Sequence, residues 1–326
     1  MFLRRRSTTG VADIGALVDS GAKRIDEYSL DSLPLRPPLP LPDAISRNEL
    51  FAWLKSVRVE DAPDSIANYC VQDFERFVHT YGLAHRAVVG ESGHCRGLEL
   101  GANPYFSTML LRYFTPIEWT LANYFSPAFS SGLNKQRVFH RKNPSSNDVV
   151  ATELSYFHFN IEEDNFPFEE GAFDIVLFCE IIEHLLNDPC KVLRQIKRVL
   201  RKDGALILTT PNVDRLENVA RLIVGANIYD PYSGYGPYGR HNREYNKHEL
   251  YTLLNYLGFT VEEIFTADVH ENHTNQFLDL CKFKNLIEYR KHDLGQYIFI
   301  RARNNGEDKG KRPEWLYRSY PPSELE

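Results

Sequence analysis

Hydrophobic residues along this chain recur in two alternating patterns, which together predict a layered α/β fold. Short, nearly continuous apolar runs predict buried strands, because a strand covered on both faces needs apolar side chains throughout. Apolar residues spaced three and four positions apart predict amphipathic helices between these runs. We expect strands at residues 95–100, 117–124, 153–159, 173–179, 205–210, 260–265 and 296–302. Helices are expected at 48–55, 64–81, 107–113, 188–200 and 247–257.

The order of these elements predicts the fold class and the division of the chain. Strands that alternate with helices form βαβ units, which build a mainly parallel sheet with helices on both faces. The expected fold is therefore a Rossmann-like α/β domain with a seven-stranded sheet and an N-terminal helical cap. We divide the chain into a proline-rich arm at 1–45, the cap at 46–90, the main domain at 91–304 and a polar C-terminal tail at 305–326. The prolines between residues 33 and 42 predict an extended strap, and the polarity of the tail predicts a loosely held end.

Composition narrows the class of partner. The 326 residues carry a formal net charge of −6, without the basic stripe that is typical of nucleic-acid-binding proteins. Five cysteines without a CxxC pair are typical of reduced thiols, so we expect a cytoplasmic protein. The apolar runs are too short to span a membrane, and the N-terminus lacks the hydrophobic region of a secretory signal. We expect a small-molecule or glycan acceptor rather than nucleic acid, and the sequence leaves a homodimer open.

A glycine-containing turn follows the strand at 95–100, where the sequence reads Gly97-Leu98-Glu99-Leu100-Gly101-Ala102-Asn103-Pro104. Glycine at such a turn lets a ligand approach the backbone closely. An acidic loop at 160–168 and the strand motif Gly171-Ala172-Phe173-Asp174-Ile175-Val176 come later in the chain. In this order, the segments between 96 and 212 resemble the class I S-adenosylmethionine-dependent methyltransferases. The rival family, dinucleotide-binding oxidoreductases, is disfavoured because GxGxxG is absent: residues 101–106 read Gly-Ala-Asn-Pro-Tyr-Phe.

This resemblance implies S-adenosylmethionine as the cofactor and assigns its contacts. Glu99 and Gly101 correspond to residues that lie against the methionine part of the cofactor in the family. Asn123 stands where the family has an acid that holds the ribose hydroxyls, and the loop beginning at Asn160 corresponds to the one beside the adenine. Asn103 and Tyr105 replace later glycines of the family's turn. The expected cofactor-binding residues are Glu99, Gly101, Ala102, Asn103, Asn123, Asn160, Ile161, Glu162 and Cys179.

Metal-competent side chains follow the strand at 173–179. Glu180, Glu183 and His184 are spaced i, i+3 and i+4, so on a helix that began at Glu180 they would share one face. Acidic residues at a helix start have an ordinary alternative explanation in the helix dipole. His241 lies in the segment after the fifth strand, which ends at the same edge of the sheet. The four residues resemble the Glu-x-x-Glu-His run and downstream histidine of metal-dependent O-methyltransferases that modify small-RNA 3′ ends. The resemblance implies Mg²⁺ or Mn²⁺ bound by Glu180, Glu183, His184 and His241.

The chemistry of these residues leaves three functions open. The first is O-methylation of a hydroxyl on a small molecule or a saccharide, as in polysaccharide biosynthesis, with His184 and His241 as the catalytic candidates. Each histidine serves either as a metal ligand or as a general base, since imidazole titrates near neutral pH. The second is RNA 2′-O-methylation, and the third is a non-catalytic binding module with the same fold. The aromatic, glycine-rich segment 228–238 is interpreted as a cover for the acceptor, a mobile lid or a surface loop.

Overall fold

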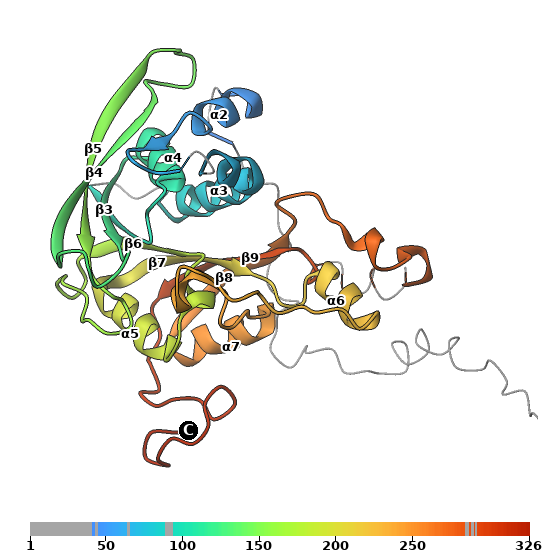
Figure 1. The fold of residues 1–326 in the computed structure, drawn as a ribbon. Helices are drawn as coiled ribbons and strands as arrows, with labels where there is room; N and C mark the ends of the chain where they lie inside the picture. The colour runs from blue at the N-terminus through green and yellow to red at the C-terminus, as the bar shows by residue number, and fades with distance from the viewer. Residues whose placement is uncertain are drawn as a thin grey trace, which may run out of the picture.

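A computed structural model describes residues 41–42, 45–63, 66–88, 94–283, 287, 290 and 292–326. Its centre is a nine-stranded sheet in the order β1-β4-β5-β3-β2-β6-β7-β9-β8 (Figure 1). Five adjacent strands are parallel: β5 (Val149–His158), β3 (Ile117–Asn123), β2 (Cys95–Leu100), β6 (Phe173–Cys179) and β7 (Leu200–Pro211). β9 (Tyr297–Asn304) runs antiparallel between β7 and β8 (Phe259–Ala267). The Rossmann-like, mainly parallel α/β fold is therefore confirmed.

The sheet has nine strands rather than the seven predicted. β4 (Gly132–Arg141) pairs antiparallel with β5, and the two-residue β1 (Arg58–Val59) pairs with β4. The sequence of β4 is mostly polar, and most of its residues are exposed or only partly buried. A strand near the sheet edge with so little buried surface has no apolar run, so the apolar pattern on which the predictions rest gave no signal for it.

Helices cover both faces of the sheet (Figure 1). α2 (Arg47–Leu54), α3 (Ile66–Val88) and α4 (Phe106–Phe114) lie on one face, and α5 (Pro189–Val199) and α7 (Lys247–Tyr256) lie on the other. A short helix, α6 (Leu216–Ile223), follows β7, and single turns of 3-10 helix occur at η3 (Ile182–His184), η4 (Pro237–Gly239), η5 (Thr274–Gln276) and η6 (Leu280–Phe283). Each layer of helices buries its own apolar cluster against the sheet.

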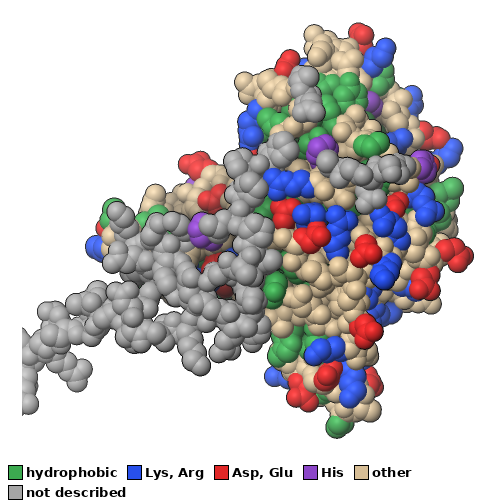
Figure 2. Space-filling model, turned by 180° about the vertical axis from the view of Figure 1, so that it is seen from behind, with side chains coloured by type: hydrophobic (Ala, Val, Ile, Leu, Met, Phe, Trp, Pro, Cys, Tyr) green, Lys and Arg blue, Asp and Glu red, His purple; other side chains and the backbone are tan. Residues whose placement is uncertain are grey.

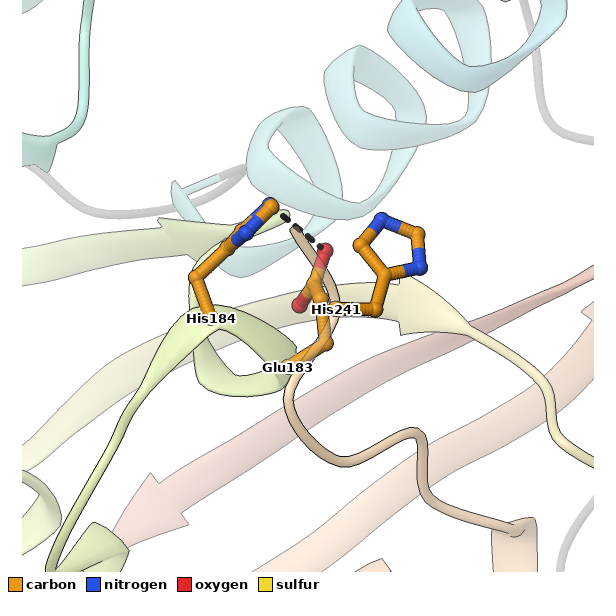
Figure 3. A group of neighbouring side chains, drawn as sticks. All are labelled: Glu183, His184 and His241. Carbon is orange, nitrogen blue, oxygen red and sulfur yellow. Dashed lines mark ion pairs between the residues drawn. The ribbon is translucent and has the colours of Figure 1, made fainter. Parts of the chain in front are cut away.

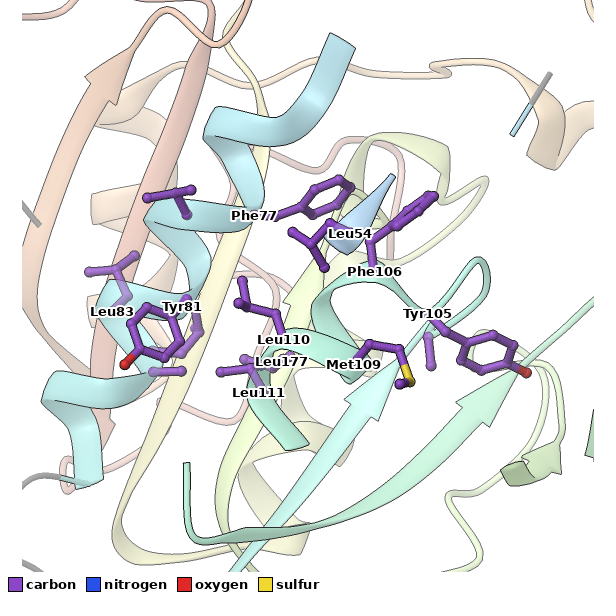
Figure 4. Close-up of a cluster of buried hydrophobic side chains, with 14 of the residues drawn as sticks. Leu54, Phe77, Tyr81, Leu83, Tyr105, Phe106, Met109, Leu110, Leu111 and Leu177 are labelled. Atoms are coloured by element: carbon purple, nitrogen blue, oxygen red, sulfur yellow. The ribbon is translucent and has the colours of Figure 1, made fainter. Parts of the chain in front are cut away.

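The helices of the predicted cap pack directly on the sheet. Leu54 of α2, Phe77 of α3 and Leu110 of α4 meet Leu177 of β6 in one buried cluster (Figure 4). α3 extends to Val88, seven residues beyond the predicted end, and contacts β7 and β9 along the sheet. The cap is therefore part of the helical layer that covers this face of the sheet.

The C-terminal tail is held against α5 rather than loosely attached. The Tyr317 hydroxyl donates a hydrogen bond of 2.6 Å to Oδ1 of Asp188, and Arg312 forms an ion pair with the same carboxylate. Asp188 is also the N-cap of α5, where it accepts a hydrogen bond from the Lys191 backbone N–H. The buried ring of Tyr317 gives the otherwise polar tail an apolar anchor. The proline-rich arm at 1–45 lies almost entirely outside the described residues.

Charges of both signs are interspersed on the molecular surface. Figure 2 shows Lys and Arg side chains beside Asp and Glu side chains over the face that it presents. Within the described part of the chain, no helix is both long enough and apolar enough to cross a bilayer. These observations agree with the balanced composition.

Candidate functional site

A cavity opens at the carboxyl ends of β2, β3, β5 and β6, which is where open parallel sheets bind their ligands. Its wall combines the turn after β2, the ends of β3 and β5, and the segment that follows β6. The lining residues are Leu100, Gly101, Ala122, Asn123, Tyr124, Phe159, Asn160, Ile161, Glu180, Ile181, His184, Leu185 and Tyr238. Four of the predicted cofactor-binding residues are among them: Gly101, Asn123, Asn160 and Ile161.

The turn after β2 requires glycine at Gly101. Its backbone has a φ of +67°, in the left-handed region, and a Cβ built on it would lie 2.9 Å from Cδ1 of Ile181. The backbone N–H groups of Gly101 and Ala102 both donate to the carbonyl of Ala122, which ties the turn to β3. Residue 101 thus brings the backbone of the turn to the cavity surface.

The side chain of Asn123 is largely engaged by the same turn. Its Oδ1 accepts a hydrogen bond of 2.9 Å from the Asn103 backbone N–H, and its Nδ2 donates to the Tyr105 hydroxyl at 3.0 Å. An amide group has one further acceptor and one further donor position, so Asn123 keeps capacity for a ligand in the cavity. The replacements at 103, 105 and 123 therefore form one hydrogen-bonded unit.

Glu162 is not in the cavity lining, although its neighbours Asn160 and Ile161 are. Its carboxylate accepts hydrogen bonds from the backbone N–H groups of Leu186 and Asn187, at 3.0 Å and 2.8 Å. Asn160 orders the same loop, because its Oδ1 accepts from the Glu162 N–H while its Nδ2 donates to the Tyr238 hydroxyl. The loop that carries Asn160 and Ile161 is thereby fixed to the turn that precedes α5.

Three other predicted residues, Glu99, Ala102 and Cys179, are not in the cavity lining but are sequence neighbours of residues that are. Glu99 is 5% exposed and accepts a hydrogen bond of 2.5 Å from Thr108 of α4. Burial raises the pKa of Glu99 to about 8, although the Thr108 hydrogen bond opposes the rise. Cys179 donates a long hydrogen bond to the Ile207 carbonyl, and burial raises the pKa of its thiol to about 12. The side chains of Glu99 and Cys179 therefore form hydrogen bonds with α4 and β7, respectively.

No helix begins at Glu180, although the expected grouping of the three side chains depended on one. Glu180 has a φ of +55°, and a single 3-10 turn, η3, follows before α5 begins at Pro189. A residue other than glycine in the left-handed region is sparsely populated and costs backbone energy, and such residues cluster at functional sites. The i, i+3, i+4 spacing therefore does not bring the three side chains together through a helix face, and that part of the prediction is wrong.

Two consecutive threonines at the end of β7 hold the two glutamates. Thr209 donates through its hydroxyl to Oε1 of Glu180 at 2.7 Å, and Thr210 donates to Oε2 of Glu183 at 2.8 Å. Glu183 is fully buried, and its second oxygen, Oε1, has no hydrogen-bond partner among the described residues. A buried carboxylate oxygen without a partner is costly and requires an explanation.

Glu183, His184 and His241 form a group that has the geometry of a metal site. Each offers a ligand atom, and these atoms lie within 4.8 Å of one another. Figure 3 shows the Glu183 carboxylate between the two imidazole rings, whose centroids are 5.0 Å apart. Glu180, the fourth predicted ligand, is not in this group. The segment that carries His241 is held in place because the Glu183 carbonyl accepts hydrogen bonds from the N–H groups of Asn242 and Arg243.

Both histidines use Nδ1 for contacts within the protein. Nδ1 of His184 lies 2.9 Å from the Arg240 carbonyl, and Nδ1 of His241 lies 2.8 Å from Oε1 of Glu244. Because a carbonyl or a carboxylate oxygen only accepts, each Nδ1 carries the hydrogen, and a neutral ring then has its lone pair on Nε2. Metal-binding histidines commonly have such a partner on the second ring nitrogen.

Burial and neighbouring charges shift the pKa values of these groups in opposite directions. Burial raises the pKa of Glu183 above the usual range of a carboxyl group, and burial lowers the pKa of His184. Burial also acts to lower the pKa of His241, but the hydrogen bond to Glu244 and the charge of Glu183 outweigh it, so that this pKa is raised. Groups with strongly perturbed pKa values in a cleft are typical of functional sites.

Sequence reasoning missed several residues of this site. Tyr124 and Tyr238 line the cavity with rings 5.9 Å apart, and Tyr238 comes from the aromatic segment at 228–238. Other tyrosines of that segment point into solvent: Tyr229, Tyr232 and Tyr235 are at least 80% exposed. Glu244 lies three residues after His241 in a segment that is not helical, so no helical spacing predicted its contact.

Comparison with known proteins finds similarity to methyltransferases. Residues 109–264 match a family model described as a methyltransferase domain. None of the curated proteins matches the sequence significantly. Among solved structures, an S-adenosylmethionine-dependent methyltransferase from Archaeoglobus fulgidus is 16% identical, covers 72% of this chain and 99% of its own, and has a TM-score of 0.42. A second such methyltransferase, from Mesorhizobium loti, is 13% identical, with coverages of 69% and 97% and a TM-score of 0.38. The carbon methyltransferase CurJ is 14% identical, with coverages of 74% and 59% and a TM-score of 0.44.

Proposed function

We propose that this chain, a class I S-adenosylmethionine-dependent methyltransferase, methylates a hydroxyl group of a small molecule or saccharide with the help of a divalent cation. The family match and the order of the motifs along the sheet make the chain such an enzyme. The oxygen acceptor, the cation and the roles of individual residues are the proposal. It rests on one observation, the buried and unpartnered Oε1 of Glu183 beside two histidines.

A divalent cation fits this group of residues. Glu183 supplies a carboxylate oxygen, and His184 and His241 supply Nε2 atoms whose rings are already fixed through Nδ1. Mixed oxygen and imidazole ligands suit Mn²⁺ at least as well as Mg²⁺. When bound, such a cation lowers the pKa of a hydroxyl group at one of its open positions. Glu180 lies outside the group, so we assign it to the acceptor side of the cavity.

The cavity is assigned to S-adenosylmethionine. Bound there, the cofactor supplies an activated methyl group for an in-line displacement, so the protein chiefly has to align the two reactants. Gly101 is proposed to bring the turn backbone to the methionine part, and Asn123 to contact the ribose. Asn160 and Ile161 would face the adenine, with Tyr124 and Tyr238 as aromatic walls. The other predicted cofactor-binding residues would not contact the cofactor but would hold these segments in position. They are Glu99, Ala102, Asn103, Glu162 and Cys179.

A second role for the histidines is favoured by one observation. Burial lowers the pKa of His184, so at neutral pH the ring is neutral and its Nε2 accepts a proton. Without a cation, His184 would remove the proton from the acceptor hydroxyl, and His241 would support the charge that develops. RNA as the acceptor has no observation beyond the metal-like group in its favour, and steep salt dependence of RNA binding would be its signature.

The first experiment is calorimetric titration with S-adenosylhomocysteine, followed by titration with MnCl₂. We expect one-site cofactor binding and a separate site for Mn²⁺. Absence of cofactor binding would contradict the proposed function and favour a non-catalytic binding module with this fold. Cofactor binding without Mn²⁺ binding would favour the general-base role of His184.

A variant pair tests the role of His241. His241→Ala should strongly reduce transfer of labelled methyl groups to acceptors while leaving affinity for S-adenosylhomocysteine nearly unchanged. The matched control is His94→Ala, because His94 is an exposed histidine whose partner, Glu118, is also exposed. Unchanged transfer in His241→Ala would exclude that residue from both proposed roles.

A further inference from the structure

A second cavity lies at the opposite edge of the sheet from the candidate functional site. Its volume is about 560 Å³, within the range of roughly 300–1,000 Å³ that is typical of small-molecule sites. Its wall combines the turn before β6, the second half of α5, the start of β7 and the segment after β9. Strands β6 and β7 begin beside it, because Phe173 pairs with Leu200 at their amino ends. The second cavity shares no lining residue with the one assigned to S-adenosylmethionine.

Positive charges outnumber negative ones in the wall of the second cavity. Four cationic side chains face two carboxylates there, which is an excess of two positive charges on a chain whose net charge is −6. The cations are Arg194, Lys197, Arg198 and Lys202, and the carboxylates are Glu170 and Asp308. Because the local excess has the opposite sign to the whole chain, overall composition does not account for it. Such a surface attracts anions.

Among the residues that the structure describes, one cation of this wall is paired with a carboxylate. Arg194 donates through Nε to Oδ2 of Asp308 at 2.6 Å and through Nη2 to Oδ1 at 3.1 Å. Lys197 and Arg198 instead donate to neutral oxygens, which satisfy their donors without cancelling their charge. These acceptors are the backbone carbonyls of Phe166, Phe168, Gly258 and Gly306 and the side chains of Gln195 and Asn304. Two partly buried positive charges therefore remain without a counter-charge.

Three groups of the wall have hydrogen-bond donors that no described residue uses. Lys202 is exposed, and its Nζ forms no hydrogen bond or ion pair within the described part of the chain. Nη1 of Arg194 and Nδ2 of Asn305 also lack an acceptor there, because the printed contacts of these residues use their other polar atoms. The three groups come from β7, α5 and the segment after β9. A phosphate group offers several charged acceptor oxygens, so it complements donors that converge from different elements.

We propose that the second cavity binds a small phosphate-bearing molecule without an aromatic group, whose phosphate contacts Arg194, Lys202 and Asn305. The excess positive charge and the unused donors select the phosphate. None of the described lining residues is aromatic, so the cavity offers no ring on which a nucleotide base would stack. The polar wall, in which Leu200 is the one large apolar side chain, matches a hydrophilic ligand such as a sugar phosphate. Binding here is independent of the proposed methyl transfer, which takes place at the other edge of the sheet.

Amide NMR titration of the full chain, treated with EDTA to remove metal ions, tests the site. The probes are inorganic phosphate, pyrophosphate and glucose 6-phosphate at constant ionic strength, with glucose and NaCl as controls. We expect at least one phosphate probe to bind with a Kd below about 1 mM and to shift amide signals around residues 194–202 and 304–308. Glucose and NaCl should leave these signals unchanged. Binding of no phosphate probe, equal shifts with NaCl, or shifts centred on the cofactor cavity would each overturn the proposal.

A charge reversal locates the phosphate within the second cavity. Lys202→Glu should weaken binding of the phosphate probes about tenfold or more, in line with the loss of a charged hydrogen bond. Because Lys202 is exposed and has no partner among the described residues, the variant should keep its Tm, which shows that it is folded. The matched control is Lys142→Glu, which changes an exposed lysine between β4 and β5 and should bind like the wild type. Equal affinity of Lys202→Glu and the wild type would overturn the site.

Discussion

Oε1 of Glu183 lies 3.8 Å from Nε2 of His184, and it accepts no hydrogen bond from the described residues. Two groups that come this close without a hydrogen bond, one a fully buried carboxylate, are arranged as ligands are arranged around a shared ion. The same pair is a source of instability in the metal-free protein. Removing the charge of Glu183 should therefore stabilise the metal-free protein but weaken metal binding.

Replacement of Glu183 by glutamine should stabilise the metal-free protein and abolish its response to Mn²⁺. The amide has nearly the same shape, keeps an acceptor for Thr210 and removes a buried charge. We expect a gain of about 1–3 kcal/mol at pH 8 in urea unfolding, the usual cost of an unsatisfied buried group. Thermal scans with and without MnCl₂ should show a shift of Tm for the wild type and for the control Glu163→Gln, which alters an exposed carboxylate. An equal shift in Glu183→Gln would exclude Glu183 as a ligand.

Replacement of Glu162 by glutamine should weaken both the fold and cofactor binding. The carboxylate accepts from two backbone N–H groups, at Leu186 and Asn187, and a neutral amide with a single acceptor oxygen cannot serve both equally well. We expect a loss of about 1–3 kcal/mol in unfolding free energy. Affinity for S-adenosylhomocysteine should fall as well, because the loop that holds Asn160 and Ile161 loses its anchor. The neighbouring Glu163→Gln should change neither quantity, and equal behaviour of the two variants would contradict this role of Glu162.

The sequence predicted those parts of the fold that are buried on both faces. β2 and β6 begin and end where the apolar pattern predicted, since both lie in the middle of the sheet. β4 lies near the edge and has few buried residues, so hydrophobicity carried no information about it. The anchoring of the tail by Tyr317 depends on a contact with Asp188, 129 residues away in sequence, which local composition cannot predict.

The sequence suggested candidate residues for a metal site, whose roles stay predictions, and it did not predict their local geometry. Glu183, His184 and His241 were chosen by residue type and by position after neighbouring strands, and the structure brings them together. The helical spacing that grouped them with Glu180 was misleading, because the chain enters a 3-10 turn there and Glu180 adopts a positive φ. Asp73 and Arg76 of α3 are buried, and the sequence gave no signal of this, because buried polar residues on a helix resemble solvent-facing ones.

Replacement of Gly97 by alanine should destabilise the protein without changing any polar contact. A Cβ on Gly97 would lie 2.6 Å from the ring of Trp119 and 2.8 Å from Cγ2 of Ile117, both on the neighbouring strand β3. Overpacking of this kind typically costs about 1–3 kcal/mol, which chemical denaturation resolves. The matched control is Gly234→Ala, where an added Cβ meets nothing within 4 Å. A loss of stability equal to that of the control would show that β2 and β3 separate easily at this point.

Stability of the metal-free and cofactor-free protein should fall as pH rises, in part because of Glu99. Burial raises the pKa of Glu99 to about 8 in the folded state, whereas the ordinary pKa of a glutamate is 4.5. The folded state therefore holds a proton that the unfolded state releases, so the stabilising contribution is complete below the unfolded pKa and is lost as pH rises towards 8. Between these values one proton corresponds to about 1.4 kcal/mol per pH unit.

Glu99→Gln keeps an acceptor for Thr108 and cannot titrate, so its unfolding free energy should depend less steeply on pH by up to that amount. Glu180 and Glu183 titrate in both proteins and cancel in the difference. Urea unfolding of the two proteins at a series of pH values measures the slopes, and parallel slopes would mean that Glu99 is ionised in the folded protein.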